Sequence, residues 1–188
     1  MNVLCHLALG GGCPDTMLGQ FLGDFTRGPV DLLPYPESVR QGIRAHRRAD
    51  ALGDAHPFVW AAKQHLPAGD RRYGGLVMDV LCDYLLHQCW ADIMTVDKAE
   101  YFRIAYQLLA KPRHPLPPPA QRFATLILDH DLLEAYADPL EIEDVLRRMS
   151  QRLRRPYDLS ALLPELLRHE TELREGFPEF FKEMRDGL

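Results

Sequence analysis

No stretch of this sequence alternates apolar and polar residues between turn dipeptides, which is the pattern of a β-strand. The apolar residues recur instead at spacings of one, three and four, which is typical of helices with one buried face. Prolines and glycines divide these stretches. The length of 188 residues suits one domain, so we expect residues 1–188 to form a single all-α domain, an irregular helical bundle.

The expected helices follow from these patterns and breaks. We expect them over residues 14–25, 37–54, 57–65, 76–93, 97–109, 121–136, 139–154 and 160–184. Before them, Asn2–Leu9 is a short apolar run that ends at three glycines, where we expect a flexible turn. Gly176-Phe177-Pro178 is expected to kink the last helix.

Composition and charge exclude several classes of protein. Apolar residues make up 46% of the chain and charged residues 26%, as in ordinary globular proteins. The net charge of −5 argues against a nucleic-acid partner, and no segment is apolar enough to span a membrane. None of the four cysteines form a C-x-x-C pair, which disfavours a zinc ribbon. We expect a cytoplasmic protein with reduced thiols.

His46 and Asp50 are the first candidate site. Residues four apart share a helix face, so an imidazole nitrogen and a carboxylate oxygen point the same way here. Such a pair is able to bind a divalent metal. An exposed ion pair is the commoner meaning of this spacing and stays open.

A second row of polar residues lies on the most apolar helix. Asp79, Asp83 and His87 follow one another at intervals of four, and burying such a row is costly unless a positive charge lies between its members. The alternative is the solvated face of an amphipathic helix. Asp24 lies near a helix C-terminus, which is unfavourable for a carboxylate and hints at function.

Two other features have simpler explanations. In Asp129-His130-Asp131, adjacent helical residues point about 100° apart, so we interpret the triplet as surface. Arginines cluster in the chain, as in Arg40, Arg44, Arg47 and Arg48. A cluster of this kind is able to receive an acidic partner, although a solvated helix face with ion pairs is commoner.

With these residues placed, the chain resembles the acyl carrier protein phosphodiesterase family, regarded as atypical HD-type metal phosphohydrolases. The resemblance is specific over the first half of the chain. It rests on four stretches, Asn2-Val-Leu-Cys-His-Leu, Gly23-Asp-Phe-Thr-Arg-Gly, Gly42-Ile-x-x-His46-Arg-x-x-Asp50, and Asp79-Val-x-x-Asp83-x-x-Leu86 followed by Trp90. It implies an HD-like helical fold.

The resemblance also implies a reaction. The phosphodiester that joins 4′-phosphopantetheine to a serine of acyl carrier protein is hydrolysed with the help of a divalent metal, Mn²⁺ before Mg²⁺. The implied metal ligands are Asp24, His46 and Asp79. The implied acid–base residues are Asp50, Asp83, His6 and His87. The residues expected to bind substrate are Arg27, Arg44, Arg47 and Arg48, since guanidinium matches phosphate geometry and attracts an acidic carrier protein.

One position departs from the family pattern. Asp83 is followed by Tyr84 where relatives usually have a histidine, and His87 lies one helical turn further along. Two other functions therefore remain as alternatives. One is a non-catalytic helical module that binds an acidic partner, and the other is an HD-type hydrolase of nucleotides.

Overall fold

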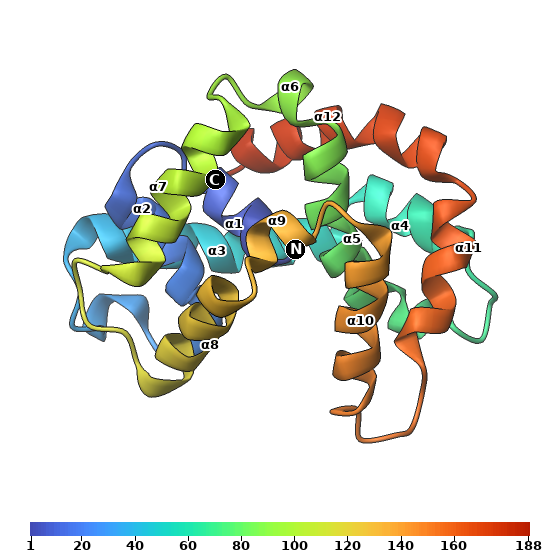
Figure 1. The fold of residues 1–188 in the computed structure, drawn as a ribbon, viewed down its shortest axis with the longest axis horizontal. Coiled ribbons are helices and arrows are strands. Elements are labelled where there is room, and N and C mark those ends of the chain that lie inside the picture. The colour runs from blue at the N-terminus through green and yellow to red at the C-terminus, as the bar shows by residue number, and fades with distance from the viewer.

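Every regular element of this protein is a helix in the computed structural model, which describes residues 1–188 (Figure 1). The α-helices are α1 Val3–Leu9, α2 Pro14–Leu22, α3 Glu37–Ala55, α4 Pro57–Gln64, α5 Gly74–Gln88, α6 Trp90–Ile93, α7 Lys98–Ala110, α8 Pro118–Asp129, α9 Leu132–Ala135, α10 Pro139–Ser150, α11 Leu163–Leu167 and α12 Glu170–Asp186. The 3₁₀ turns are η1 Gly23–Phe25, η2 Val30–Leu32, η3 Arg71–Tyr73 and η4 Leu159–Leu162. The expected all-α fold is confirmed.

Proline and aspartate set where many of these helices begin. Proline is the first residue of α2, α4, α8 and α10, where its missing N–H costs no hydrogen bond. Asp97 caps α7 by accepting from Glu100 N–H at 3.0 Å, and Asp138 caps α10 by accepting from Leu140 N–H at 2.9 Å. Such caps satisfy first-turn donors that have no helical acceptor. These signals explain why most predicted helix starts agree with the structure.

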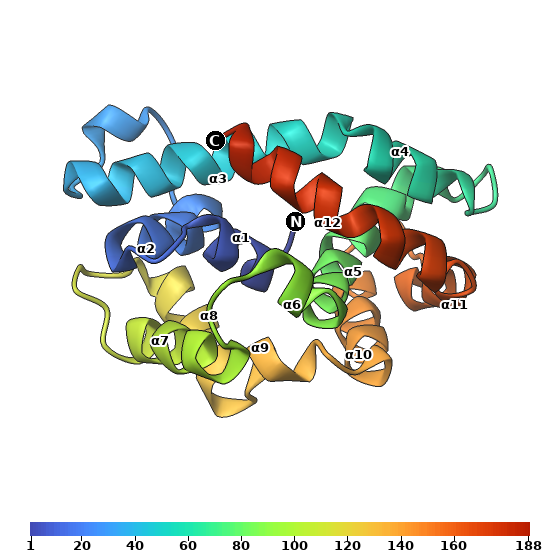
Figure 2. The same cartoon turned by 90° about the horizontal axis from the view of Figure 1, so that it is seen from above.

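The apolar helix α5 lies at the centre of the molecule. Figures 1 and 2 show α1, α2, α3, α7 and α8 on one side of it and α4 and α11 on the other, with α10 below it. Its side chains are buried almost all round, and they join a single hydrophobic core. Removing this much apolar surface from water is what stabilises a bundle without repeats or sheets.

The closest helix contact is between α2 and α3, and two glycines make it possible. A Cβ atom at Gly19 would lie 2.2 Å from the carbonyl oxygen of Val39, and one at Gly42 would lie 2.3 Å from that of Thr16. Real side chains do not tolerate such distances to backbone atoms. The two helices therefore pack backbone against backbone, as only glycine permits.

The structure corrects several predicted boundaries. The run before the glycines is a helix, α1, and not only an apolar segment. The helix expected over residues 76–93 ends at Gln88, and α6 follows Cys89. The segment 121–136 is broken at Asp131, whose φ of 47° is left-handed and ends a helix. Pro178 lies inside α12, and the expected last helix is divided into η4, α11 and α12.

Further predictions from the sequence concern the environment of the chain. No helix combines the length and the apolar composition that crossing a membrane would require. All four cysteines are free thiols, three of them buried. The cytoplasmic location and the single-domain boundaries stay predictions.

The glycine contact predicts opposite effects of one substitution at two sites on α3. Gly42→Ala should lower the free energy of unfolding by about 3 kcal/mol, because the new methyl group overlaps the backbone of α2. Gly53→Ala should raise it by about 0.5–1 kcal/mol, since the nearest atom there is 3.8 Å away and alanine favours helix. Urea unfolding followed by circular dichroism measures both, and equal effects would contradict the proposed packing.

Candidate active site

His6 lies in the middle of α1, and the beginning of that helix is capped by a residue of another helix. Asn2 occupies the N-cap position, but its side chain makes no capping hydrogen bond. Asp83 of α5 supplies the cap instead. Its two carboxylate oxygens accept from the backbone N–H groups of Leu4 and Cys5, each at 2.9 Å. Because first-turn N–H groups have no helical acceptor, Asp83 fixes α1, and with it His6, against α5.

His46 and Asp50 share one face of α3, as their spacing predicts. The His46 side chain is buried and packs against the backbone of Gly23, which begins η1. A Cβ atom at position 23 would lie 2.1 Å from Cγ of His46. Glycine is therefore required here, because any side chain would displace the imidazole.

The two histidines meet Asp50 at the centre of the site. The rings of His6 and His46 stack with their centroids 3.8 Å apart. Asp50 Oδ1 lies 3.1 Å from His6 Nε2, and Asp50 Oδ2 lies 3.2 Å from His46 Nε2. Ligating atoms of all three residues lie within 4.8 Å of one another, and we call this group the His6–His46–Asp50 cluster.

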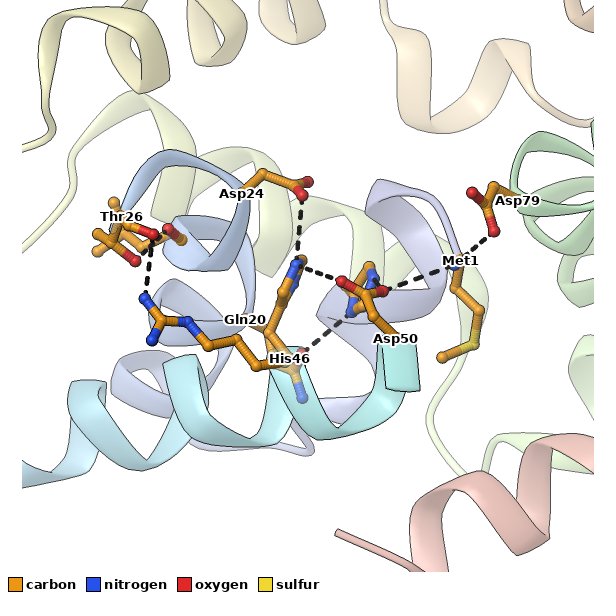
Figure 3. Close-up of polar contacts among 10 residues, drawn as sticks. Met1, Gln20, Asp24, Thr26, His46, Asp50 and Asp79 are labelled. Atoms are coloured by element: carbon orange, nitrogen blue, oxygen red, sulfur yellow. Dashed lines mark hydrogen bonds and ion pairs between the residues drawn. The ribbon is translucent and has the colours of Figure 1, made fainter. Parts of the chain in front are cut away.

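Two further polar side chains extend this cluster (Figure 3). Asp24 is mostly exposed, and its Oδ1 lies 3.3 Å from His46 Nε2. Gln20 is fully buried, and its Oε1 accepts a hydrogen bond from His6 Nδ1 at 3.2 Å. If Nδ1 carries the proton in this contact, Nε2 of a neutral His6 has a lone pair available to a cation.

Asp79 is linked to the cluster by the positively charged amino group of Met1. The amino group of Met1 donates to Asp79 Oδ1 at 2.9 Å and lies 3.8 Å from Asp50 Oδ1. Figure 3 shows Met1 between these two carboxylates. Although burial opposes it, Asp79 is the largest of the influences that raise the pKa of this amino group, to about 11. A cation therefore already lies between Asp50 and Asp79.

The protonation states leave the cluster negative. Burial lowers the pKa of His6, so this imidazole is neutral at pH 7. Burial also disfavours a charged His46, but the carboxylates of Asp24 and Asp50 outweigh it and raise the His46 pKa to about 9. Burial opposes ionisation of Asp50, yet its contacts with the two histidines hold its pKa well below the usual range. Contact with His46 lowers the pKa of Asp24 as well. One imidazolium thus faces two carboxylates.

These residues fit a divalent cation. His6 Nε2 is buried and makes no hydrogen bond, although Asp50 is near, so its lone pair has no proton donor. The nitrogen–oxygen separations of 3.1 and 3.2 Å in the cluster are close to those of neighbouring ligands around one ion. With bonds of about 2.1–2.2 Å, adjacent octahedral ligands lie about 3.0–3.1 Å apart. The two imidazoles and Asp50 supply suitable nitrogen and oxygen donors, and Asp24 lies beside His46.

Three positions of α5 lie away from the cluster. Asp83 is fully buried and occupied by the cap of α1. His87 donates from Nε2 to the Leu133 carbonyl at 2.7 Å, and burial lowers its pKa to about 4. Tyr84 donates to Glu170 of α12 at 2.6 Å. The departure from the family pattern at Tyr84 therefore falls at a contact with α12.

The predicted substrate-binding arginines fall into two groups. Arg47 donates to the carbonyl oxygens of Gly28 at 2.8 Å and Thr26 at 3.0 Å, which holds the segment after Asp24. Arg44 forms ion pairs with Asp31 and Glu37. Arg27 and Arg48 are exposed and form no ion pair, so their charge is available to a partner. A role for any of the four in substrate binding stays a prediction.

Sequence reasoning missed two residues of this site. Gln20 looks like any polar residue on an amphipathic helix, and only the structure reveals that it orients His6. Gly23 is part of a family-matched stretch, and only the structure shows that its missing side chain makes room for His46. The one signal in the sequence was that this glutamine lies among the apolar residues that form the buried face of α2.

The chain is similar to known proteins over nearly its whole length. A family described as "Acyl carrier protein phosphodiesterase" matches residues 1–184. Relatives of that name include one from Yersinia enterocolitica, 32% identical over 98% of this chain and 95% of its own. One from Photorhabdus laumondii is 29% identical over 99% of this chain and 94% of its own. One from Serratia proteamaculans is 32% identical over 98% of this chain and 95% of its own. No solved structure matches the chain.

The cap of α1 predicts that Asp83 matters for stability. At pH 8, above the value of about 6 to which burial raises its pKa, Asp83→Asn should lower the free energy of unfolding by about 2–3 kcal/mol. The amide would leave one first-turn N–H without an acceptor. Asp79→Asn, on the same helix but half exposed, should cost less than about 1 kcal/mol. Urea unfolding compares the two, and a larger loss at Asp79 would contradict the assignment.

Proposed function

The chain belongs to the acyl carrier protein phosphodiesterase family, and from this membership and its His6–His46–Asp50 cluster we propose that it hydrolyses holo-acyl carrier protein. Water adds to the phosphorus of the phosphodiester, the bond to the carrier serine breaks, and apo-carrier protein and 4′-phosphopantetheine are released. The observation that carries the proposal is the convergence of three family-matched stretches, through His6, Asp24 and the His46–Asp50 pair, on one buried and negatively charged site.

The proposed metal ligands are His6, His46, Asp50 and Asp24. A divalent ion bound there would neutralise phosphate charge and lower the pKa of water, with Mn²⁺ favoured and Mg²⁺ next. This assignment keeps Asp24 and His46 from the sequence prediction and adds His6 and Asp50, which were expected to serve as acid and base. The Asp50 carboxylate, which contacts both imidazoles, supports the change.

The remaining chemistry falls to residues around the ligands. Asp79 is half exposed beside the cluster and is our candidate to accept the proton of the attacking water. Arg27 is exposed three residues after Asp24 and would contact the phosphate oxygens. Arg48 is exposed on α3 and would attract the acidic carrier protein. Asp83 and His87 have no catalytic role in this proposal, because both are held by backbone groups.

The alternative functions lose their main support. A non-catalytic module was suggested by Tyr84, but this side chain contacts α12 and not the cluster. A nucleotide hydrolase of the HD type needs the same metal cluster, and no observation favours a base-binding site. The relation to HD-type enzymes stays a prediction.

Direct measurement of the reaction tests the proposal. Holo-acyl carrier protein incubated with this protein and Mn²⁺ should lose the mass of its phosphopantetheine arm, and a chelator should stop the loss. His46→Gln and Asp50→Asn should each lower kcat/KM about a hundredfold or more, because each removes a proposed ligand. His87→Gln is the matched control, a buried histidine outside the cluster, and should change kcat/KM less than about threefold.

Two outcomes would contradict the proposal. One is unchanged hydrolysis by folded Asp50→Asn, which would remove the cluster from the reaction. The other is no loss of mass from holo-carrier protein while a panel of nucleotide phosphodiesters is hydrolysed, which would favour the nucleotide alternative. Circular dichroism of each variant separates loss of activity from loss of fold.

Metal affinity should depend on pH in a defined direction. A metal ligand must be deprotonated, and the His46 pKa of about 9 means that binding displaces a proton at neutral pH. The apparent Kd for Mn²⁺ should therefore fall about tenfold for each pH unit between 6.5 and 8.5. Isothermal titration calorimetry in buffers of different ionisation enthalpy measures both the Kd and the proton release. A Kd independent of pH would show that His46 is not a ligand.

A further inference from the structure

A second group of side chains able to bind a metal lies where α4 ends and α12 begins. His65 follows the last residue of α4, His169 is the N-cap of α12, and Glu172 lies in the first turn of α12. Ligating atoms of these three residues lie within 4.8 Å of one another. Figure 2 shows α12 running beside α4, far along the chain from it. None of the three belongs to the proposed active site.

The geometry of this group resembles that of the first cluster. The rings of His65 and His169 stack with their centroids 3.6 Å apart and their planes inclined by 15°. Glu172 Oε2 lies 3.3 Å from His65 Nε2 and 3.7 Å from His169 Nδ1. One carboxylate oxygen thus faces a nitrogen from each ring, and the three atoms come from two helices.

His65 Nε2 gives an independent indication of a ligand. This atom is buried and makes no hydrogen bond, although Glu172 is close. A buried polar atom without a partner costs about 1–3 kcal/mol, so a water or an ion beside it would be stabilising. The exposed carboxylate of Glu172 leaves the group open to solvent on one side, where an ion and its waters have access.

From these observations we propose that His65, His169 and Glu172 bind a Zn²⁺-class ion that joins the end of α4 to the beginning of α12. Zinc bonds of about 2.0–2.2 Å place neighbouring tetrahedral ligands about 3.4 Å apart, close to the two measured separations. Two imidazoles and one carboxylate favour zinc over Mn²⁺ or Mg²⁺, which prefer oxygen ligands. Water completes the coordination.

A second histidine–glutamate contact joins α4 to α12, and its geometry is that of a hydrogen bond. His56 is the N-cap of α4, and its Nε2 lies 2.7 Å from Glu183 Oε2 of α12, an ordinary hydrogen-bond distance. No second histidine takes part in this contact. This pair spans the same two helices and provides a matched control. The proposed ion would act as a structural link, so its loss should affect stability and not hydrolysis.

Zinc titration of proteins that lack the first cluster tests the proposal. In His46→Gln, one equivalent of Zn²⁺ should still bind, measured by competition with a chromophoric chelator. Its Tm should rise by roughly 5–10 °C at a hundredfold excess of Zn²⁺ over Kd. Adding His169→Gln or Glu172→Gln should abolish both effects, whereas adding His56→Gln should leave both in place. Co²⁺ in place of Zn²⁺ should give a visible absorption that His169→Gln removes.

Two results would overturn the proposal. One is the absence of zinc binding by His46→Gln at micromolar zinc, and the other is an undiminished zinc effect after both His46→Gln and His169→Gln. In otherwise unchanged protein, His169→Gln should leave hydrolysis of holo-carrier protein intact. Because the first set of measurements needs no activity, it stands whether or not the proposed function is correct.

Discussion

The backbone contact between α2 and α3 sets the positions of the groups in the proposed active site. Gly19 and Gly42 allow the two helices to approach more closely than any other residue pair would, and the approach is fixed because backbone atoms do not yield. One turn beyond Gly42, His46 therefore meets the backbone of Gly23 at the end of α2. Asp24 follows directly, which brings a carboxylate to the same imidazole. A packing constraint thus assembles half of the site.

The other half depends on a helix cap. The short helix α1 has no cap of its own, and Asp83 supplies one from the central helix α5. This places His6 against His46, where Gln20 orients its ring. Buried carboxylates and imidazoles are costly in isolation, but here each lies against a backbone donor, an amide or an opposite charge. The remaining negative charge is what a divalent ion would balance.

The sequence predicted the parts of this arrangement that local rules govern. The i, i+4 spacing placed His46 and Asp50 together, and prolines marked the starts of many helices. The sequence did not show which of Asp79 and Asp83 lies at the site. The reason is that α5 is buried almost all round, so its apolar pattern does not tell which side faces the site. Nor did it reveal His65 and His169 as neighbours, since only the packing of α12 on α4 joins them. Tertiary contacts, not propensity, decide these cases.

The two histidine clusters share a stacked imidazole pair and differ in the charge around it. The first has Asp50, Asp24 and, through an amino group, Asp79, and its histidines are almost fully buried. Several oxygen donors and a net negative charge suit a hard ion that also meets a phosphate. The second has one exposed glutamate and less buried rings, which suits a borderline ion held by nitrogen. Because the number of carboxylates differs while the imidazoles are alike, the two proposed sites would favour different metal ions.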